Sequence, residues 1–253
     1  MNPKRGIRFA AQVLVVGLGL AAASYAAYVA VTWVRYGRVK RPSNPEGDDS
    51  LLDHFMPNYE IVERHKVRIA APAEIAFSAA CDMDLQDSAI IRGIFRVWEL
   101  LLGSKPDDKS LPQGLLAQTK ALGWGVLAEV PSREIVMGAV TQAWLADVVF
   151  RALPPDEFAS FSEPGYVKIA WTLRADPIDS SESVFRTEAR ATTTDPTARA
   201  KFRWYWSKVS PGIWLIRRLS LGPLKKEAER RAREAKPEQR MTSSQGLLGG
   251  NPL

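Results

Sequence analysis

The sequence predicts an α+β protein, with an antiparallel sheet of about six strands and a long C-terminal helix, preceded by one transmembrane helix. Three observations predict this class. Residues 9–34 carry no charge. Between residues 59 and 192, short runs alternate apolar and polar residues with period two, which is typical of strands with one buried face. After Pro196, apolar residues recur at helical spacing.

The composition excludes several classes of protein. Of the 253 residues, 46% are apolar and 25% are charged, which excludes a disordered, collagen-like or coiled-coil chain. The net charge is +6, but basic residues with interleaved aromatics (Lys201, Arg203, Trp204 and Tyr205) extend over only one turn, so no nucleic-acid partner is expected. The single cysteine, Cys81, and two histidines, His54 and His65, predict no disulfide and no metal site. No glycine-rich phosphate loop is present, and no cofactor is expected.

The uncharged run over residues 9–34 predicts a single-pass anchor in the cell membrane. As a helix it would extend about 39 Å, enough to cross a hydrocarbon core of about 30 Å. The alternative is a cleaved signal peptide, because Ala21-Ala22-Ala23 has the small-x-small form of a cleavage site. The apolar residues that continue to Val34 favour the uncleaved anchor. The basic residues after the run slightly exceed those before it, which predicts a cytoplasmic main domain.

Residues 35–58 read as a juxtamembrane linker, since prolines, glycines and mixed charges predict a flexible tether. Within it, Leu51, Leu52, Phe55 and Met56 are spaced to form one amphipathic turn that docks on the domain or on the bilayer.

The body of the chain predicts one strand, two helices and then a series of strands. Tyr59–Ala70 alternates with its odd positions inward, and Pro72 suits the first position of a helix over 73–81. A second helix is expected over 88–102, a short one within 156–165, and strands at 124–130, 134–144, 147–153, 166–174 and 184–192. The last two strands predict a solvated outer face that carries Lys168, Arg174, Arg186, Glu188 and Arg190.

The final helix is predicted to start with Asp195 as N-cap and Pro196 in the first turn. Pro211-Gly212 predicts a kink or break, and Gly222-Pro223 predicts a second break. Residues 225–236 predict a charged, solvated helix, and residues 237–253 a disordered tail.

Several stretches are similar to one bacterial branch of the SRPBCC superfamily, which includes START lipid-transfer domains, birch-pollen-allergen-like proteins and polyketide cyclase/dehydrase-like proteins. They are ERHKVRIAAPAEIAF, LAEVPSREIVMGAVTQAW, FSEPGYVKIAWTLRADP and TEARATTTDPTARAKFRWYWSKVSPGIWLIRR. The resemblance covers about 160 residues from position 59. It implies the helix-grip fold, in which a curved antiparallel sheet wraps around a long C-terminal helix and leaves a mostly apolar cavity. It carries over no catalytic signature.

Strand and helix parity select the residues expected to line such a cavity and bind a ligand. They are Tyr59, Ile61, His65, Trp171, Leu173, Phe185, Thr187, Phe202, Trp206, Val209 and Ile213. Glu63 and His65 share one strand face, so the carboxylate is expected to orient the imidazole and raise its pKa, as a general base requires. The alternative is that Glu63 lies at the rim and His65 bonds a backbone carbonyl. No catalytic residue is assigned beyond these two candidates.

The expected organisation is a basic N-terminus (1–8), a transmembrane helix (9–34), a linker (35–58), an SRPBCC-like domain (59–222), and a charged helix with a disordered tail (223–253). The favoured function is a membrane-anchored module that binds a lipid or other hydrophobic small molecule. A cyclase/dehydrase-like enzyme using His65 and Glu63 is one alternative, and an interaction protein with a filled cavity is another. The expected partners are the bilayer and the ligand; the residues indicate no particular protein partner.

Overall fold

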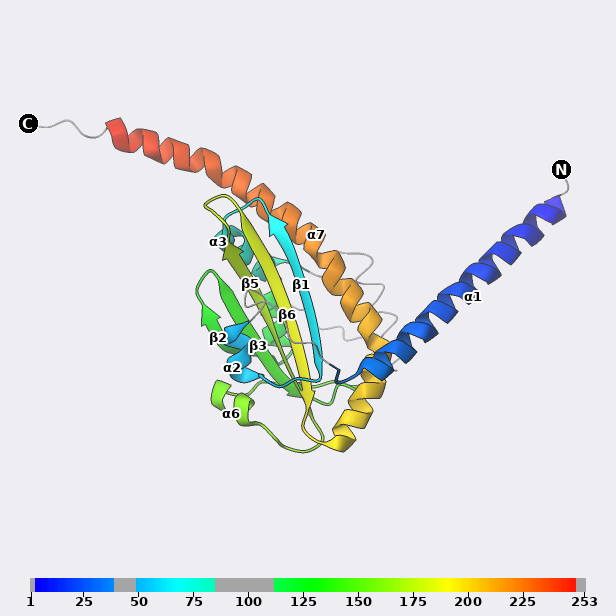
Figure 1. Ribbon diagram of the computed structural model, residues 1–253. Helices are drawn as coiled ribbons and strands as arrows, with labels where there is room; N and C mark the ends of the chain where they lie inside the picture. The colour runs from blue at the N-terminus through cyan, green and yellow to red at the C-terminus, as the bar shows by residue number, and fades with distance from the viewer. Residues whose placement is uncertain (1–2, 39–48, 85–111, 249–253) are drawn as a thin grey trace, which may run out of the picture.

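The computed structural model describes residues 3–38, 49–84 and 112–248, with side chains over 12–38, 49–84 and 112–235 (Figure 1). The helix expected over 88–102 lies outside the described residues. Within them, a six-stranded sheet has the order β1-β6-β5-β3-β2, with β4 paired to β3 and every pair antiparallel. The predicted α+β class with about six strands is confirmed.

The strands lie close to their predicted positions. They are β1 Ile61–Ile69, β2 Gly125–Val130, β3 Glu134–Thr141, β4 Phe150–Arg151, β5 Val167–Pro177 and β6 Ser183–Thr193. The helices are α1 Pro3–Arg35, α2 Ser50–Phe55, α3 Ala73–Asp82, α5 Leu115–Ala121, α6 Pro155–Ser160 and α7 Pro196–Leu248. Three details differ from expectation. The sequence predicts no helix at α5, and β4 is only two residues long. Pro72 is the N-cap of α3, because its extended ψ of 149° places it before the first turn.

Helix α7 packs against the inner face of the sheet and curves along it (Figure 1). Asp195 caps it as predicted, because its Oδ1 accepts from the backbone N–H groups of Thr197 at 2.7 Å and Ala198 at 3.0 Å. The helix is continuous through both pairs, so the break expected at Gly222-Pro223 is wrong, and at Pro211-Gly212 a break is wrong and only a kink remains. Buried side chains on each side hold it there, and tertiary packing overrides local propensity.

The C-terminal half of α7 is more buried than its charged sequence predicts. Leu224, Ala228 and Ala232 are buried in one cluster with residues of α3 and the sheet, so only part of the 225–236 stretch is solvated. Its outer side carries ion pairs such as that between Arg230 and Glu227, at 2.7 Å. The helix then continues to Leu248, whereas the sequence predicts a disordered tail from residue 237.

The outer face of the sheet is also covered, which corrects the solvated face expected from β5 and β6. Lys168, Glu188 and Arg190 are all buried. The Lys168 ammonium donates to the Ala159 carbonyl at 2.9 Å beneath α6, 5.1 Å from the centre of the Phe158 ring. The polar residues on this face therefore stay paired inside the protein rather than facing water.

Helix α2 forms much of this cover, as the amphipathic spacing in the linker predicts. Leu52, Phe55 and Met56 are buried against the sheet. Arg190 holds the helix in place, because its guanidinium bonds the Asp53 carboxylate and the Met56 carbonyl, the latter at 2.8 Å. Its Nε also donates to Glu188 at 2.7 Å, so the buried cation is fully engaged.

We expect Leu52→Ala to lower the free energy of unfolding by about 2–4 kcal/mol, because Leu52 is fully buried and its truncation leaves a cavity. Urea denaturation of the full chain in detergent measures the change. His54→Ala, at an exposed position in the same turn, serves as the control. Equal losses in the two variants would show that α2 does not dock as described.

Candidate functional site

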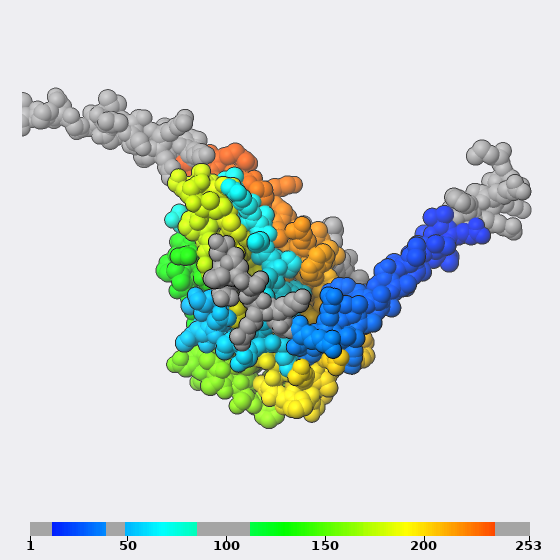
Figure 2. All heavy atoms as spheres, viewed as in Figure 1, coloured from blue at the N-terminus to red at the C-terminus, as the bar shows by residue number. Residues whose placement is uncertain are grey.

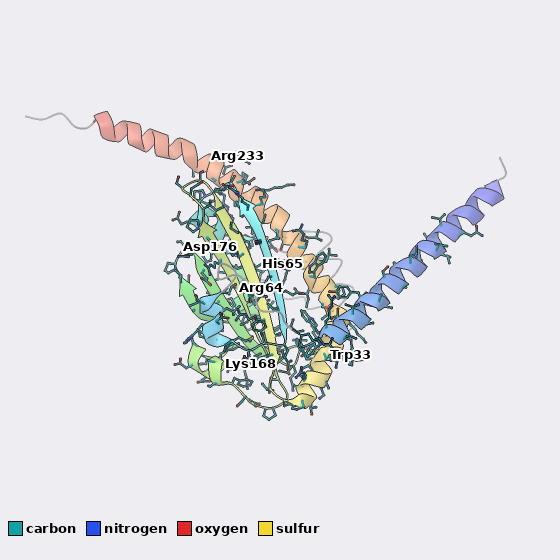
Figure 3. All side chains as sticks on the ribbon, viewed as in Figure 1. Trp33, Arg64, His65, Lys168, Asp176 and Arg233 are labelled. Atoms are coloured by element: carbon teal, nitrogen blue, oxygen red, sulfur yellow. The ribbon has the colours of Figure 1, made fainter. Side chains whose placement is uncertain are left out.

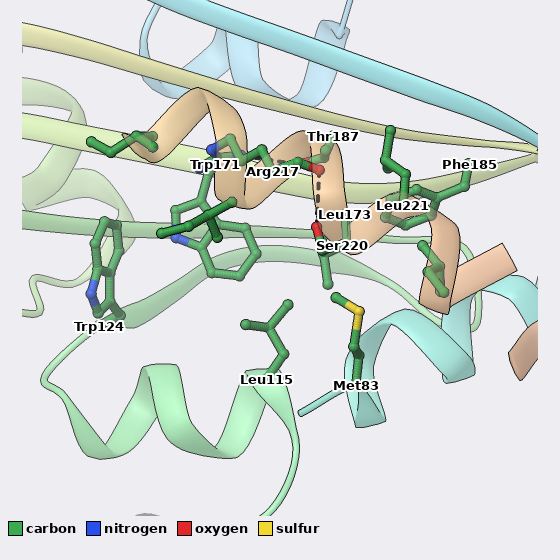
Figure 4. Close-up of a pocket in the computed structure, with 13 residues that line it drawn as sticks. Met83, Leu115, Trp124, Trp171, Leu173, Phe185, Thr187, Arg217, Ser220 and Leu221 are labelled. Carbon is green, nitrogen blue, oxygen red and sulfur yellow. Dashed lines mark hydrogen bonds between the residues drawn. The ribbon is translucent and has the colours of Figure 1, made fainter. Parts of the chain in front are cut away.

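Two adjoining cavities lie between the inner face of the sheet and α7. One, of ≈ 330 Å³, is bounded by Met83 and Leu115 at its far end, and we call it the α3-side cavity (Figure 4). The other, of ≈ 370 Å³, is bounded by Val148 and Phe150 and is called the β4-side cavity. Their walls share four residues, Trp124, Trp171, Ile213 and Arg217, so the two form one divided space.

Strand register explains why there is room at this place. Ala189 on β6 lies between Glu63 of β1 and Trp171 of β5, and Ala191 lies between Ile61 and Ile169. Small side chains in the middle strand lower the floor of the cavity, while larger ones on each side form its walls. Trp171 is held by an edge-to-face contact with Trp124, with ring centroids 6.2 Å apart.

Arg217 places a permanent cation in this apolar space. Its side chain retains 23% exposure, and it lines both cavities. Its Nη1 donates to Thr187 Oγ1 at 3.3 Å, whereas its Nε lies 3.8 Å from Glu63 Oε2, beyond hydrogen-bond distance. Burial lowers the pKa of the guanidinium and Glu63 opposes that shift, but an arginine stays charged throughout the physiological range. This half-buried cation therefore has N–H groups that no protein acceptor among the described residues uses.

Glu63 is the nearest counter-charge, and it is weakened by its surroundings. Burial raises the pKa of its carboxyl to about 7, against the opposing effect of Arg217. Its Oε2 has no hydrogen-bond partner among the described residues. Near neutral pH a substantial fraction of the carboxyl is therefore protonated, which leaves Arg217 without a full ionic partner in that fraction of molecules.

His65 lies on β1 two residues from Glu63 (Figure 3), but it lines neither cavity. The expectation that Glu63 raises its pKa is wrong. Burial lowers the pKa of the imidazole first, and the positive charges of Arg217 and Arg218 lower it further. The buried Nε2 has no hydrogen-bond partner within the part of the chain that the structure describes. The pair thus lacks the arrangement expected of a general base and its orienting carboxylate.

Most of the residues expected to line a cavity do so. Those in one or both walls are Ile61, Trp171, Leu173, Phe185, Thr187, Phe202, Trp206 and Ile213, together with Glu63. Val209 is buried but lines neither cavity. Tyr59 precedes β1 and lies with the α2 side of the molecule, where Arg190 sits 4.5 Å from its ring centroid. Strand parity misplaced Tyr59 because the ladder begins only at Ile61.

Parity reasoning missed Arg217 and Trp124. Arg217 follows Ile213 by four positions, so it falls on the apolar stripe of α7; a basic residue on that stripe was the available signal. Trp124 had no such signal, because it lies just before β2, between a turn and the first residue of the strand. Gly123 before it has a φ of +97°, and a Cβ there would lie 2.3 Å from the Phe150 carbonyl oxygen. Glycine thus permits the close approach that places Trp124 against β4.

Among the described residues, no group of three or more His, Cys, Asp or Glu side chains is placed to hold a metal ion. Cys81 is half-buried, and burial raises the pKa of its thiol to about 12, so it is not a reactive nucleophile.

We expect the stability of the protein to fall as pH rises from about 4.5 to about 7. The folded state holds the Glu63 proton more tightly than the unfolded state in this window, and that advantage is lost at higher pH. Glu63→Gln should remove a part of the loss on the order of 2 kcal/mol. Urea denaturation at pH 5 and pH 8 measures it, with the exposed Glu129→Gln as control. An unchanged pH slope in Glu63→Gln would contradict the burial of an uncompensated carboxyl.

Comparison with known proteins gives similar structures at low sequence identity. No protein-family model matches the chain, and no curated protein matches its sequence. A norcoclaurine synthase mutant from Thalictrum flavum is 11% identical, with a TM-score of 0.32, over 70% of this chain and 96% of that one. A START superfamily protein from Mycobacterium smegmatis is 12% identical, with a TM-score of 0.29, over 69% and 98%. The Zhui aromatase/cyclase from Streptomyces sp. R1128 is 14% identical, with a TM-score of 0.22, over 69% and 97%.

The fold assignment rests on the connectivity of this chain itself. A first strand is followed by helical segments, then by antiparallel strands that close against it in the order β1-β6-β5-β3-β2, and then by a long helix across the inner face. That arrangement is the helix-grip fold.

Proposed function

We propose that this protein is a membrane-anchored binding module that holds a lipid or other hydrophobic small molecule with one acidic group. The apolar part of the ligand would fill the two cavities, and its carboxylate or phosphate would bind the Arg217 guanidinium. The observation that carries the proposal is the placement of Arg217, a loosely paired cation in an otherwise mostly apolar space.

The chemistry of the walls supports an amphipathic ligand. Aromatic and aliphatic side chains form most of the lining, and three of its polar residues, Arg217, Thr187 and Glu63, lie next to one another. Binding sites for small molecules commonly combine a large apolar wall with a few polar groups that fix orientation. A guanidinium pairs with a carboxylate or phosphate through two parallel hydrogen bonds, which gives orientation as well as affinity.

Anchoring is supported by α1. Within the described residues, one helix, Gln12–Arg35, is long and apolar enough to cross a membrane. A signal sequence near the N-terminus has the same length and composition. Its apolar side chains from Val13 to Leu20 are exposed, and Figure 2 shows the helix projecting from the body of the protein. A tether of this kind raises the effective concentration of a membrane-borne ligand at the site. The excess of basic residues after the apolar run supports a cytoplasmic position of the domain.

The two alternatives find less support. An acid–base enzyme built on His65 would need the imidazole in contact with the substrate, yet His65 lines neither cavity. A filled interior is disfavoured by the ≈ 330 and ≈ 370 Å³ of space between sheet and helix.

We expect Arg217→Gln to weaken binding of cis-parinaric acid, a fluorescent fatty acid, by 10-fold or more, because a charge-assisted hydrogen bond contributes about 1.5–3 kcal/mol. Titration of the full chain in detergent, followed by parinarate fluorescence, measures the affinity. Arg218→Gln is the matched control, since Arg218 is the next residue and its side chain is exposed on the outer side of α7.

The methyl ester of cis-parinaric acid serves as a control ligand, because it has the same apolar chain as the acid but no negative charge. The wild type should bind the ester more weakly than the acid, and Arg217→Gln should not distinguish them. Equal affinity of Arg217→Gln and wild type for the acid would overturn the role of Arg217, and no binding by any variant would overturn the ligand class.

A further inference from the structure

The outward side of α7 carries a stripe of basic and apolar residues. Trp204, Leu215 and the positions Lys201, Lys208 and Arg218 recur at helical spacing and are all exposed. This outward stripe lies opposite the residues of α7 that face the cavities, such as Phe202 and Ile213. Trp214, beside the stripe, is 48% exposed, and Trp204 is 57% exposed. Large exposed aromatic residues grouped in this way indicate a surface that contacts something other than water.

The charge of the outward stripe indicates what kind of partner it binds. Residues 196–226 contain no Asp or Glu, whereas Lys and Arg recur through the whole stretch. No ion pair between described residues involves Lys201, Lys208 or Arg218. Lys208 instead lies over the Trp204 ring. A helix face that combines unpaired basic residues with tryptophan fits the anionic surface of a bilayer, where rings enter the headgroup layer and ammonium groups bind phosphates.

The contact between α1 and α7 keeps the outward stripe next to the helix that is proposed to enter the membrane. Tyr25 Oη donates to the Lys208 carbonyl at 3.0 Å, and Arg203 donates through Nε and Nη2 to the Trp33 carbonyl at 2.9 and 2.7 Å. The Arg203 guanidinium also lies 4.3 Å from the Trp33 ring centroid. The C-terminal part of α1, from Tyr25 to Trp33, therefore contacts α7, while Val31 and Val34 in the same part stay exposed. In Figure 1, α7 beyond this junction crosses the direction in which α1 leaves the domain.

We propose that the outward stripe of α7 docks on the anionic surface of the same membrane that α1 enters, so that α7 separates the cavities from the bilayer. This inference rests on the proposed anchoring through α1, but not on the identity of the ligand. Trp33 would then lie in the headgroup layer, together with Trp204 and Lys208, while the sheet faces away from the membrane.

The test uses the full chain in lipid nanodiscs with an environment-sensitive NBD label at Leu215→Cys, in a Cys81→Ala background. In discs of phosphatidylcholine and phosphatidylglycerol, brominated acyl chains should quench the label. A label at Val130→Cys, exposed at the end of β2 on the sheet edge far from α1 (Figure 1), should not be quenched. Discs of phosphatidylcholine alone should reduce quenching at residue 215.

Charge-reversal variants supply the matched comparison. Lys201→Glu with Lys208→Glu should abolish quenching at residue 215, whereas Lys66→Glu with Lys120→Glu, two exposed lysines outside α7, should leave it unchanged. A label at residue 215 that stays unquenched in anionic discs overturns the docking surface while leaving the ligand site untouched. Failure of the chain to enter nanodiscs overturns the anchoring, and the docking proposal with it.

Discussion

Packing of α7 against the inner face of the sheet is the interaction on which the rest of the molecule depends. From Phe202 to Ala232 the helix buries one side chain after another, against α1 and β1 at its start and against α3 at its end. Because the contacts at the two ends are tight and the small residues of β6 lie between them, the middle of the interface stays open. The cavity is therefore a product of the same packing that holds the fold together.

The polar groups of the protein are distributed unequally between the two faces of the sheet. On the outer face, Arg190 is surrounded by Asp53, Glu188 and the Met56 carbonyl, and such saturation makes it a structural cation. On the inner face, Arg217 has one hydrogen bond to Thr187 and one distant carboxyl. The two arginines thus have different roles: the buried Arg190 holds α2 on the sheet, and the half-buried Arg217 keeps unused hydrogen-bond donors in an apolar space.

The sequence predicted the strands because their alternation is a local property, and it predicted most of the cavity walls because parity follows from it. The sequence-based prediction of exposure was wrong where a side chain is buried by a segment that is distant along the chain. Lys168 and Arg190 occupy positions that alternate as solvent-facing ones, but α6 covers Lys168 and α2 covers Arg190. Gly222-Pro223 predicted a break that packing on both sides of the helix prevents. Arg217 was missed because an isolated basic residue on an apolar stripe is indistinguishable, in sequence, from a long side chain that reaches solvent.

The nearly neutral pKa of Glu63 has a consequence for any anion that reaches Arg217. A carboxylate ligand beside Glu63 repels its charged form, so binding would raise the proton occupancy of Glu63 and draw a fraction of a proton from the solution. Affinity would then fall as pH rises through neutrality, and the heat of binding would depend on the ionisation enthalpy of the buffer. Against an anionic membrane, whose surface is more acidic than bulk solution, the same coupling would favour loading of the site at the bilayer over loading in free solution.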